Sequence, residues 1–130
     1  MTIDVSKWLD DYRIAWETRD PDAAAALFTE DSLYREQAYQ EAFAGAQGVK
    51  EYWINVTATQ SDVKIEWGTP LVVDDHAAVE WWVNLKNAGA DITLAGEFML
   101  IFAEDGRCKE LREYWFFGEG ALRPPSGWGA

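Results

Sequence analysis

A few polar side chains in this sequence could do chemistry, and they stand among many aromatic ones. Glu36 ends the stretch Leu33–Glu36, and Glu113 lies between Leu111 and Trp115 in an alternating segment near the C-terminus. A carboxylate among apolar neighbours is rarely buried without a partner or a task. Burial raises its pKa and lets it exchange a proton near neutral pH. Glu36 and Glu113 are therefore candidate general acids or bases. The alternatives are a solvated strand end for Glu36 and a salt bridge for Glu113.

Tyr12 is the third candidate, because it lies on the apolar face of the first expected helix, where it is either a hydrogen-bond donor or plain core. The chain contains 8 Trp, 6 Phe and 5 Tyr residues, which make 15% of its length. A domain of this size cannot close its core over so many large rings. Five rings that either fill the core or wall a ligand cavity are Trp16, Trp53, Trp81, Phe98 and Trp115. The ligand that such walls imply is a small apolar or aromatic molecule.

Charge and composition argue against several classes of partner. The chain has 23 acidic and 11 basic side chains and a formal net charge of -12, so its surface repels nucleic acid and anionic membranes alike. One cysteine and one histidine cannot form a zinc cluster or an internal disulfide, and no glycine-rich phosphate loop follows a strand. We therefore expect no metal and no cofactor. No apolar segment has the length of a signal peptide or a membrane span, which predicts a cytoplasmic protein.

The elements that position these residues follow from the periodicity of the chain. The first half predicts three helices, near residues 6–18, 20–28 and 48–58, with Ser6 and Asp20 as N-caps and Pro21 in the first turn of the second helix. A short strand, Leu33–Glu36, precedes the third helix. The second half changes to a period of two and predicts a bent antiparallel meander. A chain of 130 residues is one domain, residues 1–130, of the α+β class, with the sheet curled around the helices.

Three stretches of the chain carry a family resemblance. They are DPDAAAALFTEDSLYRE, the helix start GVKEYW and the last strand GRCKELREYWF. In this order and at these spacings they resemble the SnoaL-like branch of the nuclear transport factor 2 superfamily, and the resemblance covers nearly the whole chain. It implies a cone, in which a curved antiparallel sheet wraps three N-terminal helices and leaves an internal cavity. Members of that family include steroid isomerases, polyketide cyclases, dehydratases, epoxide hydrolases and proteins with no known activity, so the fold alone does not give the function.

The resemblance extends to single residues of the ketosteroid isomerases. Tyr12 falls where those enzymes have the oxyanion-hole tyrosine, and Glu36 falls where they have the carboxylate that moves the proton. The acid that donates a hydrogen bond beside the tyrosine falls at or next to Phe98, which has no donor, and Glu97 points to the opposite face of its strand. Half of that oxyanion hole is therefore missing. The aspartate-arginine-aspartate set of the epoxide hydrolases is not evident either, because the inward face of the final strands offers Glu113 but no arginine.

Three functions remain open at this point. The first is an enzyme of the isomerase, cyclase or hydrolase type that acts on a small, mostly apolar molecule through acid–base carboxylates. The second is a non-catalytic module that binds a hydrophobic ligand. The third is a dimerisation module, in which Trp82, Met99 and Tyr114 on the outer sheet face pack in a symmetric homodimer. Two carboxylates that converge with Tyr12 on an enclosed cavity favour the enzyme, rings alone favour the binding module, and a filled cavity favours the scaffold.

Overall fold

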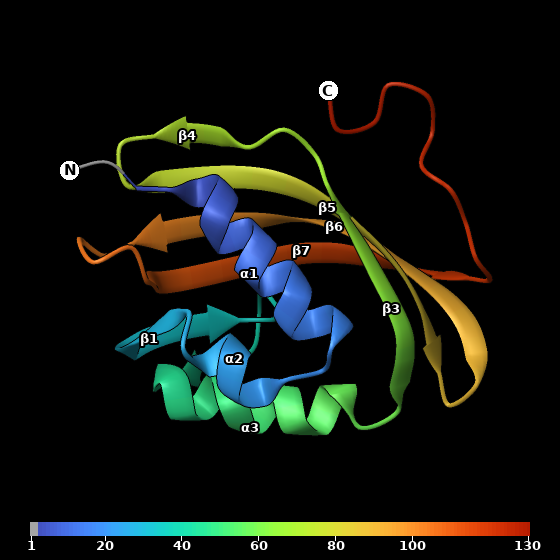
Figure 1. Ribbon diagram of the computed structural model, residues 1–130, viewed down its shortest axis with the longest axis horizontal. Coiled ribbons are helices and arrows are strands. Elements are labelled where there is room, and N and C mark those ends of the chain that lie inside the picture. The colour runs from blue at the N-terminus through green and yellow to red at the C-terminus, as the bar shows by residue number, and fades with distance from the viewer. Residues whose placement is uncertain (1–2) are drawn as a thin grey trace.

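The computed structural model describes residues 3–130 and confirms the α+β class. Three helices, α1 (Val5–Glu17), α2 (Pro21–Ala25) and α3 (Gly45–Thr57), lie inside the curve of the sheet (Figure 1). Seven strands form that sheet: β1 (Phe28–Arg35), β2 (Phe43–Ala44), β3 (Gln60–Trp67), β4 (Leu71–Val73), β5 (His76–Asn87), β6 (Ala90–Phe102) and β7 (Cys108–Glu119). None of the helices described here is long and apolar enough to cross a membrane.

The helix ends follow from capping chemistry, with two differences from the prediction. Asp4, not Ser6, caps α1, because its side chain accepts the backbone N–H of Lys7 at 3.0 Å. Asp20 caps α2 as predicted and Pro21 occupies the first turn. This helix ends at Ala25, earlier than predicted, because Phe28 already pairs with β7 as the first residue of β1.

The sheet is mixed, so the prediction of a wholly antiparallel sheet is wrong at one place. Its strand order is β2-β1-β7-β6-β5-β3, with β4 paired on β5. The β5–β6–β7 meander is antiparallel as predicted, but β1 runs parallel to β7, with Leu33 opposite Glu110. The long connection between these two strands, through α3 and the meander, allows the parallel pairing. The predicted short strand at 33–36 is the end of the longer β1, and Glu36 is the next residue.

Alternation along the long strands separates an inner face from an outer face. On β5, Val79, Trp81 and Val83 are buried against the helices, while Glu80 between them is exposed. On β7, Leu111 and Glu113 are buried and Tyr114 is exposed. The pattern confirms the predicted faces of these strands and directs Glu113 toward the helices.

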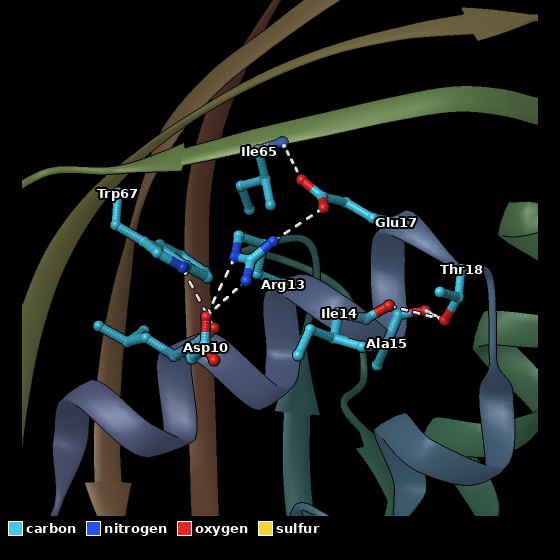
Figure 2. A network of polar contacts seen from close by, with 9 residues as sticks. Asp10, Arg13, Ile14, Ala15, Glu17, Thr18, Ile65 and Trp67 are labelled. Carbon is cyan, nitrogen blue, oxygen red and sulfur yellow. Dashed lines mark hydrogen bonds and ion pairs between the residues drawn. The ribbon is translucent and has the colours of Figure 1, made fainter.

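Two hydrogen bonds fix α1 to the edge strand β3 (Figure 2). The carboxylate of Glu17 accepts the backbone N–H of Ile65 at 3.1 Å, and the indole N–H of Trp67 donates to the carbonyl of Leu9 at 3.1 Å. Glu17 is also held by Arg13 at 3.0 Å. A free N–H on an edge strand invites pairing with another chain. The carboxylate therefore covers this edge and sets the position of α1 over the sheet.

The C-terminal tail, residues 120–130, packs on the outer face of the sheet, although its sequence has no period. It turns back beyond the end of β7 (Figure 1). Thr93 Oγ1 donates to the carbonyl of Gly120 at 2.8 Å and accepts the N–H of Leu122 at 2.9 Å. Trp82 donates to the Leu122 carbonyl at 3.0 Å, and its ring meets that of Trp128 edge to face, with centroids 5.8 Å apart. Trp82 is therefore partly covered by its own chain and is not the free outer residue that the sequence predicted.

Candidate functional site

An aromatic cavity of about 100 Å³ lies between α1, α3 and the inner face of the sheet. Thirteen residues line it: Tyr12, Trp16, Tyr34, Glu36, Tyr52, Trp53, Val56, Thr57, Gln60, Trp81, Leu94, Glu113 and Trp115. Seven of them are Tyr or Trp, and the only charged side chains are the two glutamates. Pockets for drug-sized ligands have volumes of about 300–1,000 Å³. This cavity therefore suits a smaller molecule.

The cavity brings together most of the residues that the sequence suggested. Glu36, Glu113 and Tyr12 all line it. So do four of the five expected wall residues, Trp16, Trp53, Trp81 and Trp115. Phe98 does not line it. Its fully buried ring packs against the rings of Tyr12 and Trp81, with centroid distances of 5.2 Å and 5.6 Å. Alternation places Phe98 on the correct face of β6, but its position along the strand puts it in the core.

Glu113 carries a buried carboxylate that lines the cavity. Its side chain is 8% exposed, and within residues 3–130 no hydrogen bond or ion pair reaches its oxygens. The salt bridge considered for it does not form within residues 3–130. The adjacent Arg112 lies on the opposite face of β7 and pairs with Glu110 at 3.5 Å. Burial, and then the negative charge of Glu36, raise the pKa of Glu113 well above its ordinary value. A carboxyl in this state can hold a proton at a pH where surface glutamates have lost theirs.

Glu36 is half-buried and directly follows Arg35, the last residue of β1. Its backbone carbonyl accepts the indole N–H of Trp115 at 3.2 Å, which ties the end of β1 to β7. Its carboxylate accepts a hydrogen bond from the Gln37 amide at 3.1 Å. Tyr34 and Glu36 both line the cavity, while Arg35 between them donates to the carbonyl of Gln40 at 2.8 Å. The alternation of β1 therefore continues one residue past the strand and brings Glu36 to the cavity.

Tyr12 and Tyr34 form a hydroxyl pair beside the carboxylates, with their oxygens 2.9 Å apart. Burial, and then the negative charge of Glu113, raise the pKa of both phenols well above the ordinary value. The pKa of Tyr52 is raised by the same two causes in the same order. The phenols therefore stay neutral. Because one O–H of the Tyr12–Tyr34 pair is used between them, the other remains free to donate to a ligand.

Six further lining residues were missed at the level of sequence, and three of them are Tyr34, Gln60 and Tyr52. Tyr34 could have been found by alternation, since it stands two residues before Glu36 on the same strand. Gln60 had no local signal, and its amide oxygen accepts the indole N–H of Trp16 at 2.9 Å. Tyr52 precedes Trp53 on α3, and its ring stacks on Phe43 with centroids 4.5 Å apart. The indole N–H of the buried Trp81 has no hydrogen-bond partner among the described residues.

Metal and thiol chemistry find little support at this site. Residues 3–130 contain no group of three or more His, Cys, Asp or Glu side chains that could hold a metal ion. The thiol of Cys108 is buried and donates to the carbonyl of Glu110 at 3.1 Å. Burial raises its pKa to about 12, so the thiolate that a nucleophile requires is not populated near neutral pH.

The curved sheet, the three enclosed helices and the aromatic cavity define a cone-shaped protein of the nuclear transport factor 2-like class. The chain belongs to the SnoaL-like domain family, whose family model matches residues 6–111. This confirms the resemblance seen in the three sequence stretches. No curated protein matches the chain in sequence.

Solved structures share this fold at low sequence identity. A hypothetical protein from Catenulispora acidiphila, with a ketosteroid isomerase-like fold and in complex with trimethylamine, is 17% identical over 87% of this chain and 86% of its own, with a TM-score of 0.75. SalBIII, an epoxide hydrolase/cyclase-like enzyme with a role in pyran ring formation in the polyether salinomycin, is 18% identical over 88% of this chain and 94% of its own, with a TM-score of 0.76. RV0760c from Mycobacterium tuberculosis is 14% identical over 91% and 99%, with a TM-score of 0.75.

The raised pKa of Glu113 predicts a pH-dependent stability. The folded state holds the Glu113 proton more tightly than the unfolded chain does, so the free energy of unfolding falls as the pH rises from the unfolded pKa through the folded one. Each pKa unit corresponds to about 1.4 kcal/mol. Glu113→Gln removes this loss. We expect its melting temperature to exceed that of the wild type clearly at about pH 8 and little at about pH 4.

The matched control is Glu104→Gln, in an exposed turn, which should keep the wild-type dependence on pH. Thermal melts of the three proteins across this range make the comparison. A Glu113→Gln effect of the same size at both pH values would contradict the assignment.

Proposed function

We propose that this protein binds a small, predominantly apolar molecule in the aromatic cavity and moves a proton on it with Glu113. The observation that carries the proposal is the Glu113 carboxylate, which is buried, lines the cavity and is unpaired within residues 3–130. A general acid or base works best when its pKa lies near the working pH, and burial moves a carboxyl in that direction. Isomerisation, cyclisation and hydrolysis all use such a group.

The other polar groups supply supporting roles in this proposal. The free O–H of the Tyr12–Tyr34 pair would donate to negative charge that develops on a ligand oxygen. Glu36 is the second carboxylate, and its charge favours the protonated form of Glu113. The four tryptophans Trp16, Trp53, Trp81 and Trp115 would orient the ligand and exclude water.

The solved relatives support a small-molecule cavity in this fold. One is an epoxide hydrolase/cyclase-like enzyme, and another was crystallised with trimethylamine. At identities of 17% and 18%, the similarity shows a shared fold and does not show a shared reaction. The volume of about 100 Å³ favours a ligand smaller than a steroid or a polyketide.

A second candidate function is binding without catalysis. Phe98 stands at or next to the position where the ketosteroid isomerases have a hydrogen-bonding acid, and its ring can donate nothing. Seven rings dominate the lining, and their packing around a ligand needs no proton transfer. In this case Glu36 and Glu113 orient the ligand only.

We expect the protein to accelerate the isomerisation of a β,γ-unsaturated cyclohexenone, measured by the absorbance of the conjugated product. Loss of a general acid or base costs about 10²- to 10⁴-fold in rate, so Glu113→Gln should abolish the activity. Glu36→Gln should lower activity or change affinity at least about tenfold, which corresponds to about 1.4 kcal/mol. Glu104→Gln should behave as the wild type.

The outcomes separate the two candidates. Full activity in Glu113→Gln would refute the catalytic role. Binding of the cyclohexenone, followed by tryptophan fluorescence, without any turnover would support the binding module. If neither turnover nor binding occurs with this ketone or with a panel of small neutral aromatics, the proposed function is wrong.

We further propose that the outer sheet face forms a symmetric homodimer. Tyr114 and Phe116, alternate residues of β7, are 53% and 82% exposed there. Large exposed rings in a row favour contact with a partner, and a two-fold interface is the commonest arrangement. Because Glu80 lies directly opposite Glu97 and the tail covers part of Trp82, the contact should centre on β7.

Light scattering at micromolar concentration should give twice the mass of one chain. Phe116→Glu should shift the protein to the monomer and keep the wild-type circular dichroism spectrum, because this side chain makes no core contact. Glu119→Gln, at the exposed end of the same strand, serves as the control. A wild-type mass equal to one chain would refute the dimer.

A further inference from the structure

The charge of the cavity lining is entirely negative. Among the lining residues, Glu36 and Glu113 are acidic and none is Lys, Arg or His. The basic residues nearest to them in sequence are engaged elsewhere, since Arg35 donates to the Gln40 carbonyl and Arg112 pairs with Glu110. Within the described part of the chain, the groups around Glu113 are phenols and a carboxylate, and no positively charged side chain lines the cavity beside it.

The aromatic walls add to this negative character. Each ring presents a negative face and a positive edge. The most positive point of an indole is its N–H. Oxygens of Gln60 and Glu36 accept those of Trp16 and Trp115, while the buried N–H of Trp81 has no partner among the described residues. A cation over an aromatic face is attracted by the ring, and this attraction strengthens once the cation is removed from water.

The alternatives fit this cavity less well. An anionic ligand would meet two carboxylates with no counter-charge, and a neutral ligand could hydrogen-bond Glu113 but could not neutralise its negative charge. For a bare metal ion, residues 3–130 hold no cluster of three or more His, Cys, Asp or Glu side chains that could bind it. What remains is a cation whose outer atoms are carbon.

We propose that the cavity selects ligands that carry a small alkylated ammonium group, which packs against the aromatic rings and is neutralised by Glu113 and Glu36. This inference rests on the proposed function, because it names the ligand class of the same cavity. Methyl or ethyl groups on the nitrogen supply the apolar surface that the tryptophans require. The volume of about 100 Å³ limits the group to a few carbon atoms around the nitrogen.

Binding of such a cation also changes the protonation of Glu113. The groups that face Glu113 are the phenols of Tyr12, Tyr34 and Tyr52 and the carboxylate of Glu36. The phenols are already neutral and cannot take up a proton. A cation beside Glu113 favours the carboxylate, so a proton leaves Glu113 for the solvent as the cation binds.

The test compares choline with its neutral isostere, in which a quaternary carbon replaces the ammonium nitrogen. The two have nearly the same shape, so titration calorimetry of the full chain at about pH 8 isolates the effect of charge. We expect choline to bind at least about tenfold more tightly. Glu113→Gln should bring the two affinities together, and Glu104→Gln should keep the difference. Equal or tighter binding of the isostere would overturn the inference.

A measurement on the wild type alone keeps the test independent of how the variant folds. Calorimetry near neutral pH in phosphate and in Tris, whose heats of ionisation differ, reports proton release on choline binding. We expect net release; no release, or uptake, would overturn the inference. If choline fails to bind while the cyclohexenone binds, the cation inference is wrong and the proposed function stands. If choline, its isostere and the neutral probes all fail, both are wrong.

Discussion

The burial of the Glu113 carboxylate among aromatic rings, without a counter-charge, is the constraint on which the site depends. An unpaired buried charge is costly, and the group responds by holding its proton. Its position follows from the sheet, because alternation on β7 directs Leu111 and Glu113 inward. The helix that faces it, α1, is held to β3 by the Glu17–Ile65 hydrogen bond of 3.1 Å.

Several of the rings that line the cavity contact one another edge to face. Tyr12 contacts Trp16 and Trp53 edge to face, with interplanar angles of 88° and 87°. Trp16 meets Trp81 at 67° with centroids 6.0 Å apart. Aromatic pairs prefer such edge-to-face contacts, which favour this arrangement of the cavity walls. Phe98 supports the same network from the core, which explains why an expected wall residue has a structural position instead.

Features of this protein that depend on local sequence patterns were predicted, whereas features that depend on long-range contacts were not. Alternation at residues 111, 113 and 115 was enough to place Glu113 inward, and the Asp20–Pro21 pair was enough to start α2. The parallel pairing of β1 with β7 could not be predicted, because no local signal links strands so far apart in sequence. Alternation also gives the face of a strand and not the depth, so Phe98 was misplaced. The C-terminal tail has no periodic pattern, so its packing over Trp82 could not be predicted from the sequence.

The central claim is that the surroundings of Glu113 keep its carboxyl protonated above the pH at which an ordinary glutamate ionises. Carbon-13 NMR of protein labelled at the glutamate side-chain carboxyl carbon follows each glutamate through a pH titration, and loss of one resonance in Glu113→Gln assigns it. We predict that the Glu113 resonance titrates well above the ordinary glutamate value of about 4.3. Titration of Glu113 together with the exposed glutamates would contradict the account.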